Sequence, residues 1–102
     1  MTKVKLINND EFILEITGHS GYANKGSDIV CSAISSMSTL LITYLNKVYG
    51  NIALEINEKY GYLYFKTRKI IDNHSEMLIM SYKEMIADLC EQYPSNVMFI
   101  EW

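Results

Sequence analysis

The spacing of apolar residues in this sequence changes in a regular order, from the alternation typical of strands to the three- or four-residue spacing typical of helices. That order constrains the fold more than any other feature. Two short runs rich in β-branched residues, 3–7 ("KVKLI") and 12–18 ("FILEITG"), are joined by "NNDE", which is typical of a hairpin. Residues 52–57 ("IALEIN") and 62–67 ("YLYFKT") repeat the arrangement, with a turn near residues 59–61. The sequence therefore predicts two β-hairpins.

Helical spacing governs the two longer segments. From Asp28 to about Tyr49 apolar side chains recur every three or four residues, and Gly50 suits a C-terminal cap. The apolar positions of this first helix are Val30, Ile34, Met37, Leu41, Tyr44, Leu45 and Val48.

A second helix is predicted from about Asn73 to Gln92, where Asn73 and Glu76 resemble a capping box. "NVMFIEW" at 96–102 predicts a final strand. The inner stripe of the second helix is predicted to be Leu78, Tyr82, Met85, Ile86 and Leu89.

The predicted order is β-β-α-β-β-α-β, which defines an α+β fold with two helices packed on a mainly antiparallel sheet. At 102 residues the chain is long enough for one core, so we expect a single domain over residues 1–102. One side of the first helix carries hydroxyl groups and no charge, which is unusual for a surface in open solvent. A homodimer contact is one way to cover that side.

Composition argues against several classes of protein. Apolar residues make up 49% of the chain and charged residues 21%, as in a soluble globular protein. A net charge of −3, a pI near 5.3 and a single arginine, Arg68, argue against binding of nucleic-acid phosphates. The uncharged window 29–46 is rich in Ser and Thr, so we expect a buried helix and no membrane contact. Two cysteines and no secretory signal predict a cytoplasmic protein.

The stretch 18–33, "GHSGYANKGSDIVCSA", places a histidine and a cysteine on either side of a glycine-bearing loop. Cys31 falls in the first turn of the predicted helix, where the amide N–H groups and the helix dipole favour a thiolate. A thiolate beside the imidazole of His19 is the pair that acyl transfer needs, and first-turn amides would stabilise the oxyanion. Against this, the carboxylate of Asp28 disfavours a nearby thiolate, and a free cysteine is often an ordinary buried side chain.

This stretch resembles the signature of the bacterial ribosomal-processing cysteine proteases, in which a Gly-His pair and a glycine-bearing loop precede Asp-Ile-Val-Cys. The chain length and the order of elements are similar, although Ser20 and Ser32 stand where alanine is frequent. The resemblance implies a cysteine protease with His19 as general base and Cys31 as nucleophile, without a metal or cofactor. It also implies a flexible loop over the site, here Ser20 to Ser27.

The resemblance further implies a substrate and a set of contacts. In this family the enzyme is a homodimer that removes the short N-terminal extension of the precursor of large-subunit ribosomal protein twenty-seven, cleaving after two aromatic residues. Asp28 has two readings, as the cap of the helix or as a partner that orients His19. The residues expected to bind the peptide are Gly18, Ser20, Gly21, Tyr22, Gly26 and Asp28.

Two other functions stay open at the level of sequence. The same fold with an unreactive Cys31 would be a ribosome-associated module that binds the precursor without cleaving it. A zinc site would need His19, Cys31, His74 and Cys90 together, although their spacing fits no common zinc motif.

Two groups of side chains have structural and functional readings. Three tyrosines alternate in the second hairpin: Tyr60, Tyr62 and Tyr64. On one face they would stack RNA bases or line a groove for a peptide, although the acidic chain favours a packed surface. Three methionines of the second predicted helix are expected in the core: Met77, Met80 and Met85.

Overall fold

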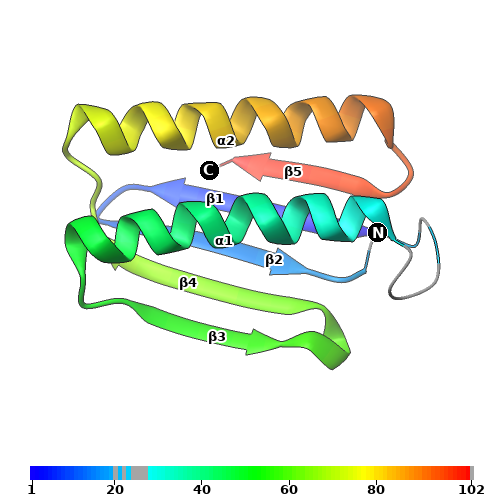
Figure 1. Ribbon diagram of the computed structural model, residues 1–102, viewed down its shortest axis with the longest axis horizontal. Helices are drawn as coiled ribbons and strands as arrows, with labels where there is room; N and C mark the ends of the chain where they lie inside the picture. The colour runs from blue at the N-terminus through cyan, green and yellow to red at the C-terminus, as the bar shows by residue number, and fades with distance from the viewer. Residues whose placement is uncertain (20, 22, 24–27, 102) are drawn as a thin grey trace.

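The computed structural model describes residues 1–19, 21, 23 and 28–101, which form two layers (Figure 1). Both helices lie on the same face of one sheet. The predicted α+β order is confirmed, with boundaries shifted by one or two residues. In chain order the elements are β1 (Thr2–Asn8), β2 (Glu11–Thr17), α1 (Ile29–Tyr49), β3 (Ala53–Asn57), the short 3-10 helix η1 (Glu58–Tyr60), β4 (Tyr62–Arg68), α2 (Asn73–Gln92) and β5 (Val97–Glu101).

The sheet is mixed and has the strand order β3-β4-β2-β1-β5. The pairs β1/β2, β2/β4 and β3/β4 are antiparallel, whereas β1 and β5 run parallel at the other edge. Because successive side chains of a strand point to opposite faces, alternate residues of the central strands face the helices. Those fully buried on that face are Val4, Leu6, Phe12, Leu14 and Phe65.

The core lies between this sheet face and the inner stripes of the helices. The buried apolar residues of α1 are Val30, Ile34, Leu41, Ile42 and Leu45. Burial of one such aliphatic side chain contributes about 1.5–3 kcal/mol. By length and composition α1 would also suffice to cross a membrane. In this fold one stripe of α1 packs on the sheet, and only six of its 21 residues are buried, so the helix is less buried than predicted.

One polar contact is buried between the two helices. The hydroxyl of Ser38 on α1 lies 2.8 Å from the hydroxyl of Tyr82 on α2, and both residues are buried. Burial raises the pKa of Tyr82 to about 12, so the phenol stays neutral and shares a hydrogen bond with the serine. The hydroxyl residues of α1 that stay exposed are Ser32, Ser35, Ser36, Thr39 and Thr43.

Two predictions for α2 are wrong. The N-cap is Asp72 rather than Asn73, because the Asp72 carboxylate accepts a hydrogen bond of 2.9 Å from the N–H group of Ser75. The buried residues of α2 recur at 75, 79, 82 and 86, which is the narrow stripe that one sheet face can cover. Three methionines lie outside that stripe and are exposed: Met77, Met80 and Met85.

Tyr49 at the end of α1 holds the start of α2. Its hydroxyl donates to the Asp72 carboxylate and accepts from the N–H groups of Ile71 (3.0 Å) and Asp72 (3.3 Å). The guanidinium of Arg68 lies 5.6 Å from the centre of the Tyr49 ring and donates to the Tyr49 carbonyl. The hydrogen bonds from Tyr49 and Ser75 lower the pKa of Asp72 to about 2.

The hydrogen bonds to the Asp72 carboxylate make the stability of the fold depend on pH in the acid range. The pKa of Asp72 is about 2 in the folded chain and near its ordinary value of 3.8 in the unfolded chain, so the unfolded state takes up the proton first. The stabilisation is therefore complete above about pH 5 and is lost between about pH 4 and pH 2. In Tyr49→Phe the pKa of folded Asp72 returns toward its ordinary value, so we expect a smaller fall in melting temperature across that window.

Thermal unfolding followed by circular dichroism at pH 5, 4, 3 and 2 measures the effect. Tyr60→Phe is the matched control, because the Tyr60 ring is 67% exposed and lies in η1. Equal acid dependence of Tyr49→Phe and the unmodified protein would contradict the prediction.

Candidate active site

The first helix begins with a carboxylate cap. Asp28 is only 6% exposed, and its Oδ1 accepts hydrogen bonds from the N–H groups of Val30 (3.0 Å) and Cys31 (2.9 Å). Its Oδ2 accepts a longer bond of 3.5 Å from the N–H group of Ala23, and its carbonyl accepts from Ser32. Of the two readings of Asp28, the cap is confirmed.

The cap changes what the first turn can do chemically. The N–H groups of Val30, Cys31 and Ser32 all donate to Asp28, so these three amides do not form the predicted oxyanion hole in this structure. The negative charge of Asp28 also offsets the positive end of the helix dipole close to Cys31. A positive group beside the Cys31 sulfur would therefore have to come from another element.

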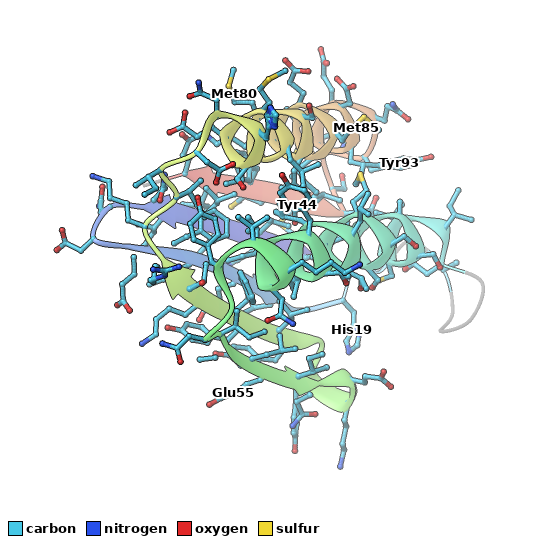
Figure 2. All side chains as sticks on the ribbon, turned by 60° about the vertical axis from the view of Figure 1, so that its left-hand side comes forward. His19, Tyr44, Glu55, Met80, Met85 and Tyr93 are labelled. Carbon is cyan, nitrogen blue, oxygen red and sulfur yellow. The ribbon has the colours of Figure 1, made fainter. Side chains whose placement is uncertain are left out.

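His19 is the candidate for that group, and it lies at the exit of β2. Gly18 before it has φ of 86°, and a Cβ there would collide with the carbonyl of Met1, so glycine is required. The His19 side chain is exposed and its Nε2 lies 3.3 Å from the carbonyl oxygen of Lys59 in η1. Figure 2 shows the imidazole pointing toward the hairpin of β3 and β4.

Cys31 and Cys90 are not joined in a disulfide, and both are half-buried. Burial raises the pKa of the Cys90 thiol, which makes it a poor nucleophile at neutral pH. Cys90 packs against the core, close to its predicted place. Cys31 is the cysteine that lies at the N-terminal end of α1, the end of the molecule at which β2 also finishes (Figure 1).

The loop between His19 and Cys31 is described only in part. Gly21 is exposed and has φ of 71°. The predicted substrate contacts Ser20, Tyr22 and Gly26 lie outside the described residues, so the loop over the site stays a prediction.

An apolar row crosses the sheet beside His19. Ile16 of β2 pairs with Leu63 of β4, and Leu63 pairs with Ile56 of β3, so the three side chains share the helix-facing side. The exposed fraction rises from 8% at Ile16 to 59% at Ile56, because α1 lies over the central strands and leaves β3 open (Figure 1). Sequence reasoning missed this row, because Ile56 has the alternation of a buried strand and only its edge position exposes it.

Two of the three tyrosines share a sheet face, as predicted, and Tyr60 does not. Tyr60 belongs to η1, while Tyr62 and Tyr64 lie on the sheet face opposite the helices. Burial and the nearby carboxylates of Glu15 and Glu55 raise the pKa of Tyr62, whose hydroxyl donates to Glu15. Carboxylates on this face oppose RNA binding, and the tyrosines do not share the helix-covered face.

The four-residue zinc site is ruled out by the length of α2. His74 and Cys90 lie near opposite ends of this helix, about 24 Å apart at 1.5 Å per residue, so they cannot bind one ion. Among the described residues no group of three or more His, Cys, Asp or Glu side chains is placed to hold a metal ion.

The sequence matches a known family over nearly its whole length, and that family defines a class of peptide hydrolase. Residues 1–98 match the family described as cysteine protease Prp. The chain belongs to the cysteine protease Prp family, which favours an enzyme over a non-catalytic binding module. No curated protein sequence matches the chain.

Solved structures share the fold over the whole chain. A Staphylococcus aureus protein described as an essential ribosomal processing protease Prp, with a covalently linked product peptide, has a TM-score of 0.84 at 15% identity and 100% coverage of both chains. The same description with a substrate peptide applies to a second structure, with a TM-score of 0.73 at 16% identity and 100% coverage of both chains. SMU.848 from Streptococcus mutans has a TM-score of 0.74 at 28% identity, covering 99% of this chain and 93% of that one.

Two substitutions of Asp28 distinguish the effect of its negative charge from the effect of its hydrogen bonds as the helix cap. Asp28→Asn keeps an acceptor for the first-turn amides, so we expect stability within about 0.5 kcal/mol of the unmodified protein. The substitution also removes the carboxylate charge from the turn that carries Cys31, so we expect iodoacetamide to alkylate Cys31 faster than in the unmodified protein. Asp28→Ala removes the cap and should cost about 1 kcal/mol.

Urea unfolding and iodoacetamide alkylation measure the two effects. Both are made in a Cys90→Ser background, so that Cys31 is the reacting thiol. Slower alkylation of Asp28→Asn than of the unmodified protein would show that the carboxylate activates the thiol instead of opposing it.

Proposed function

We propose that this cysteine protease is an endopeptidase that processes a ribosomal protein precursor, with Cys31 as nucleophile and His19 as its base. The observation that carries the dyad is that β2 delivers His19 and α1 delivers Cys31 at the same end of the fold. Two Staphylococcus aureus structures of this fold, described as ribosomal processing proteases with bound peptides, support the substrate class. The specific substrate we propose is the extended precursor of large-subunit ribosomal protein twenty-seven.

The proposed reaction has two stages. His19 takes the thiol proton, Cys31 Sγ attacks the scissile carbonyl carbon, and the C–N bond breaks as His19 returns that proton to the leaving amine. The N-terminal fragment is then held on Cys31 as a thioester. A water molecule that loses its proton to His19 hydrolyses the thioester and regenerates the thiol. Because the first-turn amides are engaged by Asp28, oxyanion donors in this scheme come from other groups.

The substrate peptide is proposed to lie beside His19, with an apolar side chain on the exposed end of the Ile16–Leu63–Ile56 row. Gly18, Gly21 and the loop residues Ser20, Tyr22 and Gly26 are proposed to surround the peptide. Asp28 acts indirectly, because its buried carboxylate holds the turn that carries Cys31.

The proposal includes a cytoplasmic homodimer. The outer side of α1 is a shallow surface of hydroxyl groups around Leu40, which is 64% exposed, and a second copy would cover it. A net charge of −3 supports a protein partner rather than nucleic acid.

Cleavage is tested by intact-mass analysis of the extended ribosomal protein from the same organism after incubation with the enzyme. We expect loss of a short N-terminal peptide, no cleavage by Cys31→Ala, and a rate about 10²- to 10⁴-fold lower for His19→Ala. Cys90→Ser is the control and should keep the unmodified rate. An intact precursor with a folded enzyme would overturn the substrate, and cleavage by Cys31→Ala would overturn the dyad.

The apolar row is tested by Ile56→Ser. Ile56 is 59% exposed, so we expect a folded enzyme that has lost about 1 kcal/mol of contact with the peptide, seen as a KM about fivefold higher with kcat unchanged. Ile71→Ser is the matched control. Ile71 is 76% exposed and comes just before α2, which begins at the end of the molecule away from the N-terminus of α1 (Figure 1). A KM that rises equally in both variants, or in neither, would remove Ile56 from the substrate site.

A further inference from the structure

We infer that the main-chain carbonyl of Lys59 orients His19 and selects its tautomer, an inference that rests on the proposed His19–Cys31 dyad. A carbonyl oxygen can only accept a hydrogen bond, so its contact of 3.3 Å with Nε2 requires the proton on Nε2. Neutral His19 then has its lone pair on Nδ1. Nδ1 is therefore the atom that takes the proton from Cys31, and Lys59 supplies a third, positioning member of the site.

The Lys59 carbonyl is held by a closed turn. The Asn57 side chain accepts a hydrogen bond of 3.4 Å from the N–H group of Tyr60, and the N–H group of Gly61 donates to the carbonyl of Glu58 at 3.2 Å. The pairing of Asn57 with Tyr62 closes the hairpin at the base of this turn. The peptide group of Lys59 is thus fixed relative to β4, and through β4 relative to β2.

Gly61 brings this turn against the histidine. Its φ is 62°, and a Cβ built there would lie 2.5 Å from the Gly18 carbonyl oxygen, 2.8 Å from the Gly18 carbonyl carbon and 3.1 Å from His19 Cε1. Two of these contacts are with backbone, which cannot rotate away as a flexible side chain can. A side chain at position 61 would therefore push η1 and the His19 ring apart.

The same hydrogen bond serves both charge states of the imidazole. When His19 takes the proton from Cys31, Nε2–H stays the donor and the bond becomes charge-assisted, which strengthens it. The negative end of the Lys59 carbonyl dipole then faces the imidazolium. Because Asp28 offsets the dipole of α1, a stabilised imidazolium is the main support for the thiolate.

The first test reads the tautomer directly and needs no substrate. Long-range ¹H–¹⁵N NMR spectra of the ¹⁵N-labelled protein distinguish Nε2–H from Nδ1–H, and the chain has only two histidines. His74 is exposed near the start of α2 and serves as the internal reference, assigned with His74→Gln. We expect neutral His19 to be almost wholly the Nε2–H form. A tautomer mixture equal to that of His74, or a majority of Nδ1–H, would overturn the inference.

The second test moves the turn with Gly61→Ala. A displacement near 1 Å can cost about 10²-fold in rate, so we expect kcat about 10- to 100-fold lower with KM little changed and the His19 tautomers approaching those of His74. Gly50→Ala is the control for backbone strain, because Gly50 has φ of 61° and ψ of −164°, a conformation at least as costly for alanine as that of Gly61, but its nearest neighbour to a built Cβ is 3.9 Å away. An equal loss of kcat in both variants, or an unchanged tautomer in Gly61→Ala, would show that position 61 acts through stability alone.

The two tests also separate this inference from the proposed function. An Nε2–H tautomer in a protein that does not cleave the precursor would uphold the role of Lys59 and overturn the substrate. Cleavage by a protein whose His19 shows no preference would uphold the protease and overturn the role of Lys59. If Gly61→Ala does not fold, the spectra of the unmodified protein still decide.

Discussion

The antiparallel pairing of β2 with β4 is the constraint on which the site depends. It sets Ile16 opposite Leu63, so the exit of β2 meets the tip of the hairpin formed by β3 and β4. A shift of one residue would turn every side chain of β4 to the other face of the sheet, exposing Phe65 and moving the Lys59 carbonyl away from His19. The free energy that buries Phe65 therefore also places the histidine.

Local periodicity was enough to predict the helices and strands. Apolar residues recur at every second position in a strand and at every third or fourth position in an amphipathic helix, so the sequence shows which element each segment forms. The cap of α2 was misplaced for a physical reason. Asp72 and Asn73 are both good caps, and Asp72 is selected by a hydrogen bond from Tyr49 at the end of the other helix. Met85 was misplaced because apolar character and helical spacing do not reveal how wide a stripe the sheet covers.

Candidate site residues could be proposed from the sequence by residue type, whereas contacts made by the main chain could not. His19 and Cys31 stand out because imidazoles and thiols carry chemistry at recognisable spacings, and family membership agrees with a thiol protease. The contact of His19 with Lys59 joins positions 40 residues apart through a carbonyl that every residue possesses. No side-chain pattern encodes such a partner. The exposed end of the apolar row was missed for a related reason. Edge strands and central strands have the same alternation of apolar and polar residues, so the sequence does not show which strand lies at the edge of the sheet.

Asp28 shows a conflict between folding and reactivity within one side chain. Its carboxylate satisfies the amides that start α1, which stabilises the helix that carries Cys31. The amides that it engages are not also available to an oxyanion. A buried cap at this point makes the helix a rigid support for the sulfur, and in the proposed dyad the activation of Cys31 comes from His19 at the end of β2.

The parallel pairing of β1 with β5 has a consequence for how the chain is made. β1 is synthesised before β5, so one edge of β1 stays without its partner until β5 has been made. The elements that carry His19, Cys31 and Lys59 all precede residue 69 and can assemble on the other side of β1 earlier. An emerging chain would thus expose a hydrophobic strand edge beside a largely formed candidate site, a state prone to intermolecular strand pairing. Closure by β5 ends that exposure, which gives the last strand a protective role separate from catalysis.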